Sequence, residues 1–205
     1  MVNFEKYKND GWGLSKKCFE NILEIVKIFN KNEINVLEFG SGISTQFLVD
    51  LIEKGYNLNI ISYDNDMVYA TKAKHPNLKL IICDLIETYD SDFENLFQEK
   101  KYKKSVFHKL TTEIDFRQKN VFYDVEEEQL PKNIDLMIVD GPHGNGRSIA
   151  FLHGIGRLKS NSYVIIDDYN HYDFVKRFEK IYPNSELIYS SNSGQENKWE
   201  SGGNY

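Results

Sequence analysis

The sequence predicts an α/β fold: a Rossmann-like, doubly wound and mostly parallel sheet with helices on both faces. The first observation is that short, nearly continuous apolar segments alternate with segments of helical spacing along the chain. The second is a glycine turn, G-S-G, between the first apolar segment and the following helix. Helices that cover both sides of a parallel sheet make its strands apolar on both faces, so this alternation favours such a sheet.

The expected elements alternate in chain order. We expect strands at 34–39, 57–64, 78–84, 134–140 and 162–168, with a sixth at 185–190. We expect helices at 18–29, 44–54, 67–74, 147–158 and 172–182. The strands are short apolar runs, whereas a helix such as 18–29 repeats its apolar residues at helical spacing.

The chain is expected to form a single domain, 1–205, because its 205 residues suffice for one complete core. A helical segment, about 1–30, precedes the first strand, and an insertion, about 86–130, separates the third strand from the fourth. The insertion contains a lysine run, Q-E-K-K-Y-K-K, expected to be a solvated helix face or, alternatively, a cover over the substrate. No seventh strand can be placed in the polar C-terminal stretch, which leaves that sheet edge open to a homo-oligomer contact.

Composition argues against several classes of protein. A net charge of −6 and a pI of about 5.4 give no broad basic surface, so no nucleic-acid partner is expected. No apolar run approaches the roughly 18 residues of a membrane span, and the N-terminus lacks the apolar region of a signal peptide. Cys18 and Cys83 form no CxxC motif, so both are expected to be reduced, in a cytoplasmic protein without a membrane partner.

Aspartates follow the strands after the first. Asp64 ends the second expected strand, Asp84 the third, Asp140 the fourth, and Asp167 and Asp168 the fifth. The carboxyl ends of parallel strands meet at one edge of a sheet, where ligands gather. So many like charges at one edge would repel each other unless something positive lies there.

The glycine turn lies in the stretch E-F-G-S-G-I-S-T, which differs from a dinucleotide fingerprint. Thr45 stands where the third glycine of G-x-G-x-x-G belongs, and Glu38 would face a phosphate unfavourably. A ligand with an amine and a sulfonium but no phosphate suits this loop better. Gly40 and Gly42 allow close approach of the backbone, and the helix N-terminus can hold a carboxylate. Asp64 lies roughly 20 residues further on, where an acid accepts from ribose hydroxyls.

S-adenosylmethionine has this set of groups, and E-F-G-S-G-I-S-T resembles the first motif of the class I S-adenosylmethionine-dependent methyltransferases. The stretches I-D-L-M-I-V-D-G-P-H-G and Y-V-I-I-D-D-Y resemble motifs of small-molecule and sugar O-methyltransferases, and the resemblance covers about 12–182. It implies that Asp64 binds the ribose and that Asp84 lies near the adenine. The residues predicted to bind the cofactor are Glu38, Gly40, Ser41, Gly42, Ser44, Thr45, Asp64, Asn65, Asp84 and Asp140.

A magnesium site is predicted from Asp140, Asp167 and Asp168, because carboxylates at adjacent strand ends suit Mg²⁺. The pattern is similar to that of catechol O-methyltransferase and of the divalent-metal sugar and antibiotic O-methyltransferases. The metal would hold two oxygens of the acceptor and lower the pKa of the attacking hydroxyl. Alternatively, V-D-G-P-H-G with a following arginine resembles methyltransferases that act on polysaccharide acids, which need not share the metal. In a third interpretation the aspartates only cap a helix or shape a turn.

Candidate catalytic residues are Asp140, His143 and His171, since a histidine beyond a strand end can act as a general base. Arg147 is expected to be a surface charge in the first turn of a helix, with pairing to a substrate anion as the alternative. The sequence thus predicts an S-adenosylmethionine-dependent enzyme that methylates an oxygen of a small molecule or sugar unit. A nicotinamide-dependent oxidoreductase and a non-catalytic scaffold domain are the alternatives.

Overall fold

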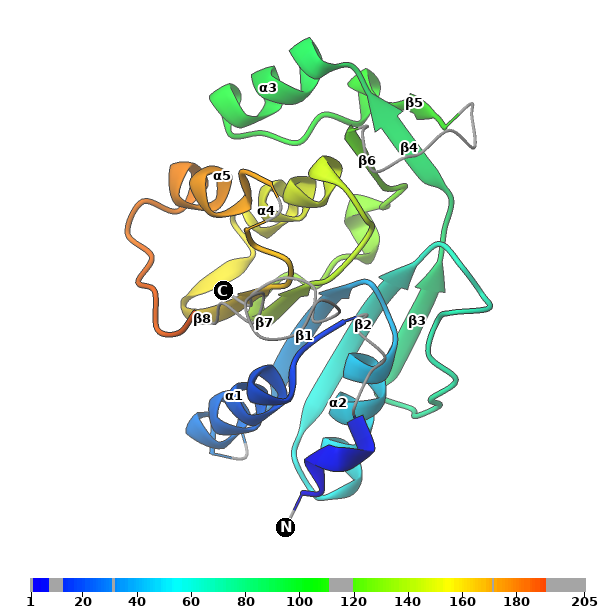
Figure 1. Ribbon diagram of the computed structural model, residues 1–205, viewed down its shortest axis with the longest axis vertical. Helices are drawn as coiled ribbons and strands as arrows, with labels where there is room; N and C mark the ends of the chain where they lie inside the picture. Colours follow the sequence, from blue (N-terminus) through cyan, green and yellow to red (C-terminus); the bar gives the residue numbers. More distant parts are fainter. Residues whose placement is uncertain (1, 8–12, 31, 111–119, 171, 191–205) are drawn as a thin grey trace.

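A five-stranded parallel sheet in the order β3-β2-β1-β7-β8 forms the centre of the molecule (Figure 1). The structure is a computed structural model and describes residues 2–7, 13–30, 32–110, 120–170 and 172–190. The strands are β1 (Ile34–Phe39), β2 (Leu58–Asp64), β3 (Leu78–Ile82), β7 (Ile134–Val139) and β8 (Leu158–Ile166). Strand order reverses at β1, so the loops after β1 and β7 meet at the switch point where open α/β sheets bind ligands.

Helices cover both faces of this sheet. One face is covered by η1 (Phe4–Tyr7), α1 (Lys16–Ile28) and α2 (Ile43–Glu53), and the other by α4 (Ile149–Gly154) and α5 (Phe174–Ile181). Side chains of β1 alternate between the two cores, since Val36 packs in the first and Leu37 in the second. The prediction of a doubly wound, mostly parallel sheet is therefore confirmed. Among the described residues, no helix combines the length and the apolar character that crossing a membrane requires.

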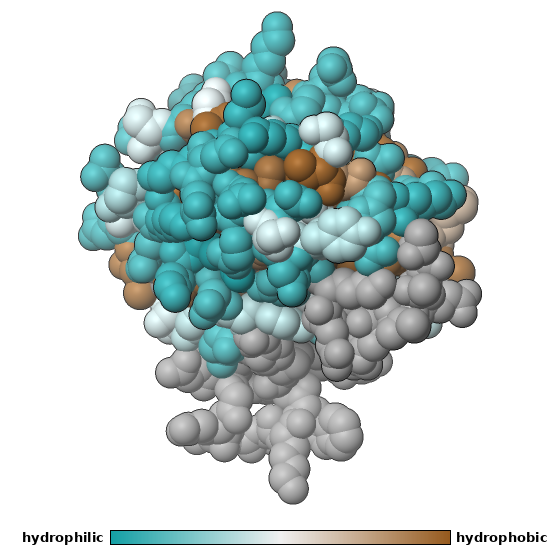
Figure 2. Space-filling model, turned by 90° about the horizontal axis from the view of Figure 1, so that it is seen from above, coloured by the Kyte–Doolittle hydropathy of each residue, from teal (hydrophilic) through white to brown (hydrophobic). Residues whose placement is uncertain are grey.

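A second, antiparallel sheet lies beyond the carboxyl ends of the main strands (Figure 1). It has the order β5-β4-β6 and is formed by β4 (Leu85–Thr88), β5 (His108–Lys109) and β6 (Asn120–Tyr123). Its neighbours are α3 (Asp90–Glu99), η2 (Lys104–Val106), η4 (Glu127–Gln129) and η5 (Asn145–Ser148). The lysine run begins where α3 ends, and most of its lysines are exposed. Figure 2, a view from the side of this sheet, shows a mostly hydrophilic surface.

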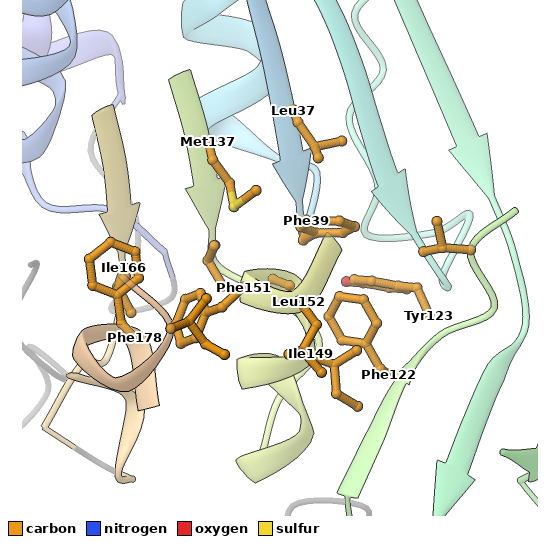
Figure 3. Packing of buried hydrophobic residues seen from close by; sticks show 14 of the residues in the cluster. Leu37, Phe39, Phe122, Tyr123, Met137, Ile149, Phe151, Leu152, Ile166 and Phe178 are labelled. Carbon is orange, nitrogen blue, oxygen red and sulfur yellow. The ribbon is translucent and has the colours of Figure 1, made fainter. Parts of the chain in front are cut away.

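The second sheet is joined to the main sheet by aromatic packing. Phe122 and Tyr123 of β6 lie against Phe39 at the end of β1, with ring centroids 5.0 and 6.2 Å from that of Phe39 (Figure 3). All three rings are buried. Burial of large aromatic side chains contributes strongly to stability, so this contact fixes the second sheet over the strand end that carries the glycine loop.

Two expected elements are absent, and the predictions for them were wrong. The segment 67–74 forms a turn and irregular chain instead of a helix, because Asp64 and Asp66 accept hydrogen bonds from nearby backbone N–H groups at 2.7 to 3.0 Å. Such side-chain bonds compete with the helical ones. The segment 185–190 is irregular and mostly exposed instead of a sixth strand. The remaining expected elements occur within a few residues of their predicted positions, although the helix expected at 147–158 is divided into η5 and the short α4.

A buried histidine links the segment after β6 to α4. The His153 ring is fully buried, and its Nδ1 lies 2.6 Å from Glu127 Oε1, while Arg157 donates to Glu127 Oε2 at 2.6 Å. Its Nε2 has no hydrogen-bond partner within the described part of the chain. Burial lowers the pKa of His153, and the nearby Glu127 carboxylate only partly opposes this effect. The neutral imidazole is therefore the form that the fold favours.

Stability should fall with acidification because of His153. Its folded-state pKa lies below the unfolded value of about 6.5, so its contribution is complete above that pH and is lost as the pH falls below it. The slope from this one group is at most about 1.4 kcal/mol per pH unit. Denaturant unfolding of His153→Gln should show a shallower decline between pH 6.5 and 5, with pH 8 as the baseline for packing changes. An unchanged slope would contradict this assignment.

Candidate functional site

The loop after β1 is held against the loop after β7. Gly40 has φ +94°, and a Cβ there would lie 2.7 Å from the backbone nitrogen of Gly141. The N–H groups of Asp140 and Gly141 both donate to the carbonyl of Phe39, at 2.8 and 2.7 Å. Gly40 is thus required by the contact between two protein loops. Gly42 is different, because a Cβ there would meet open space.

Glu38 lies beneath the first turn of α2 and shapes the glycine loop. Its Oε2 accepts hydrogen bonds from the hydroxyls of Thr45 and Ser62, both at 2.6 Å, and Thr45 Oγ1 accepts from the N–H of Gly42 at 3.0 Å. Glu38 is fully buried, and its Oε1 has no hydrogen-bond partner among the described residues. Burial raises the pKa of Glu38, although the nearby hydroxyls of Ser44, Ser62 and Thr45 oppose this effect. A donor that hydrogen-bonds to Oε1 would therefore remove the free-energy cost of leaving this buried acceptor unsatisfied.

Asp64 joins the loops after β1 and β2. Its Oδ2 accepts from the N–H and the hydroxyl of Ser41 at 2.9 and 3.1 Å, and its Oδ1 accepts from the N–H groups of Asn65 and Asp66 at 2.7 and 3.0 Å. A carboxylate has about four lone-pair sites, so these bonds occupy all of them. Its predicted bond to a ribose stays a prediction, and a ribose hydroxyl would have to replace that of Ser41.

The other predicted cofactor residues have different surroundings. Ser44 is buried in the first turn of α2, and Asn65 is exposed after β2. Asp84 lies between β3 and β4 with a strongly exposed side chain, 3.7 Å from Lys109 of the second sheet. Its carbonyl also accepts from the N–H of Asp124, just after β6, so the structure gives no support for placing Asp84 with the glycine loop.

Asp140 and Asp167 form a carboxyl pair at the ends of β7 and β8. Their side chains lie close enough to act on each other, and two neighbouring buried carboxyls favour protonation of one of them. Burial and the charge of Asp167 raise the pKa of Asp140, and burial likewise raises that of Asp167. Asp167 is almost fully buried, whereas Asp140 is partly exposed. Of this pair, Asp140 is thus the more exposed residue.

The predicted metal site of Asp140, Asp167 and Asp168 is not formed. Within the residues that the structure describes, no group of three or more His, Cys, Asp or Glu side chains is arranged to hold a metal ion. The physical reason is that the carboxylates have other partners: Asp140 pairs with Asp167, and Asp168 Oδ2 lies 3.6 Å from Nη1 of Arg147. The Mg²⁺ prediction therefore gains no support from these contacts.

Arg147 is the residue that sequence reasoning placed wrongly. It is 2 % exposed instead of forming a surface charge. Its Nε donates to the carbonyl of Pro142 at 3.0 Å and its Nη1 to the carbonyl of Asp167 at 3.1 Å. The signal that could have found it was the acidic edge itself, which needs a positive charge nearby.

The two candidate histidines remain predictions. His143 follows the cis Gly141–Pro142 bond and is partly buried in the loop after β7. His171 lies outside the described residues. The structure therefore does not identify either histidine as a general base.

The sheet order, the glycine loop between β1 and α2, and the acidic ends of the following strands define a class I S-adenosylmethionine-dependent methyltransferase fold. The chain belongs to the methyltransferase domain family, whose family model matches residues 37–169. That match contains both the glycine loop and the acidic pair.

Comparison with other proteins adds little detail. No curated protein matches the chain. Among solved structures, one described as a SAM-dependent methyltransferase from Streptococcus mutans aligns at 14% identity with a TM-score of 0.43. The alignment covers 88% of this chain and 42% of that one, so this chain spans less than half of that protein's length.

Two glycine variants should separate folding from cofactor binding. Gly40→Ala should lower the free energy of unfolding by about 2 kcal/mol or more, because φ is positive and backbone lies in the way. Gly42→Ala should unfold like the wild type within about 0.5 kcal/mol, since its Cβ meets no protein atom. It should nevertheless weaken S-adenosylhomocysteine binding in calorimetry. If Gly42→Ala binds S-adenosylhomocysteine with wild-type affinity, the cofactor does not occupy the open space beside Gly42.

Proposed function

We propose that this chain binds S-adenosylmethionine in the loop after β1 and methylates an oxygen of a small molecule or sugar unit. The observation that carries the proposal is the buried carboxylate of Glu38 beneath the first turn of α2, with one oxygen left unsatisfied by the described residues. An ammonium group complements such an oxygen, whereas a phosphate would be repelled by it.

The residues of the loop fit the groups of this cofactor. Gly42 leaves open space, and the first turn of α2 has backbone N–H groups that can hold a carboxylate. Glu38 offers its free oxygen to the ammonium, directly or through a water molecule. S-adenosylmethionine, when bound, supplies a methyl group on a sulfonium centre. The loop itself contributes position, since catalysis of a direct displacement comes largely from orientation.

The carboxyl pair suits an oxygen acceptor. A hydroxyl must lose its proton as its oxygen attacks, whereas a neutral amine can attack before it loses one. Asp140 is the partly exposed member of the pair with Asp167. A carboxyl whose pKa is raised is, once ionised, a stronger base than an ordinary one, so the pair would take up the hydroxyl proton in the form in which both carboxyls are ionised. Asp140 would thus accept the proton of the attacking hydroxyl.

The alternatives fit less well. A nicotinamide dinucleotide would place its pyrophosphate near Glu38, and Thr45, in the position of the third glycine, donates to that carboxylate. A non-catalytic scaffold domain would have no use for a buried carboxyl pair, because burying such a pair lowers stability. Assistance by Mg²⁺ is left out of the proposal, because the carboxylates expected to bind it have other partners.

Calorimetric titration tests the cofactor. S-adenosylhomocysteine should bind with micromolar affinity and NAD should not, because only the former presents an ammonium and no phosphate. Glu38→Gln should weaken this binding. Ser62→Ala is the matched control, because it removes a hydrogen bond to the Glu38 carboxylate and leaves the carboxylate in place. Binding of NAD alone would favour the oxidoreductase, and binding of neither compound would favour the scaffold.

Asp140→Asn tests the general base. Acceptors would first be found by transfer of a labelled methyl group to panels of phenols, sugars, carboxylates and amines. With an oxygen acceptor, Asp140→Asn should lower kcat by about 100-fold or more while S-adenosylhomocysteine still binds. Unchanged kcat would remove Asp140 from proton transfer, and methylation of amines alone would refute the oxygen assignment.

A further inference from the structure

One buried cation lies among the aspartates at the carboxyl edge. The Arg147 side chain is 3 % exposed and lies 3.6 Å from the Asp168 carboxylate, whose side chain is 11 % exposed. The charge of Arg147 also acts on the carboxyls of Asp140 and Asp167. The positive charge of Arg147 therefore acts on all three aspartates of the predicted metal site.

We propose that the Arg147 guanidinium is the permanent cation of this edge and fills the electrostatic role of a divalent metal, so that the site works without one. The inference concerns the site of the proposed function and rests on it for the role of Asp140. The arrangement of charges can be tested without any turnover. Arg147 is a positioning residue here, because it acts through the aspartates and the loops that carry them.

The contacts of Arg147 leave it little freedom to give way to a metal ion. Its Nε and Nη1 donate to the carbonyls of Pro142 and Asp167, which fixes the planar group between the loops after β7 and β8. The ring of Phe174 lies 5.6 Å from its Cζ and supports the cation further. A lysine would keep the positive charge but not the planar group that binds two carbonyls, because its ammonium is a point charge on a flexible chain.

The surrounding acids are also arranged for one positive charge. Asp168 pairs with the guanidinium, whose charge also acts on Asp140 and Asp167. Magnesium requires near-ideal octahedral coordination at about 2.1 Å, and a second cation beside a buried guanidinium would be repelled. Removal of the arginine charge should reverse this situation and leave an acidic pocket that attracts a divalent ion.

The experiment is a calorimetric titration of the full chain with MgCl₂ and with MnCl₂, together with melting curves in each salt. Wild type should show no saturable binding up to millimolar metal and no specific rise in Tm. Arg147→Met should acquire a metal-dependent rise in Tm, and Arg147→Met combined with Asp167→Asn should lose it. Arg147→Lys should behave like wild type toward the metal, because the charge remains.

Several outcomes would overturn the proposal. Stoichiometric wild-type binding of Mg²⁺ that Asp167→Asn abolishes would show a metal beside the arginine. A folded Arg147→Met that gains no metal binding would show that the guanidinium charge is not what excludes the ion. If Arg147→Met does not fold, the wild-type titration with MgCl₂ and MnCl₂ tests the proposal, and saturable binding there contradicts it. S-adenosylhomocysteine binding, measured separately, distinguishes failure of this inference from failure of the proposed function.

Discussion

The candidate site depends on how a crowded set of carboxylates is neutralised at one edge of a parallel sheet. The topology brings the ends of β1, β2, β7 and β8 together, and an aspartate follows three of these strands. Asp64 is satisfied by backbone N–H groups and the Ser41 hydroxyl, so it stabilises loops without any cation. Asp84 avoids the problem by exposure to solvent. Among the described aspartates of this edge, those after β7 and β8 are the ones that need a proton or a positive charge.

The structure meets that need with one proton and one arginine. Burial of the Asp140–Asp167 pair favours protonation of one carboxyl, and Arg147 compensates Asp168 while donating to two carbonyls. Breaking a buried pair by removing one partner is strongly destabilising. The position of Arg147 therefore also holds the loops after β7 and β8 in place, which ties the electrostatics of the site to its geometry.

The fold could be predicted from the sequence because burial on both faces makes each strand continuously apolar, as in Ile34–Phe39 and Ile134–Val139. The site could be predicted only in outline. The sequence placed the acids at the strand ends, yet it could not show that Asp64 bonds backbone groups or that Asp140 lies beside Asp167. Those partners come from segments distant in the sequence. The burial of Arg147 was missed for the same reason, since a charge among turn residues resembles a surface charge until α5 packs over it.

Two of the three glycines of G-P-H-G-N-G-R are explained by packing before any ligand is considered. A Cβ at Gly141 would lie 2.3 Å from the Tyr123 hydroxyl, and one at Gly146 would lie 2.1 Å from the Val121 carbonyl of β6. The loop after β7 is thus in contact with the second sheet on one side and with the Gly40 loop on the other. Arg147 follows Gly146 directly, so any shift of β6 would move the backbone that carries the guanidinium. The strand β6 is therefore in mechanical contact with the loop that carries Arg147. Changes in β6 can alter the charge environment of the candidate site without touching a substrate.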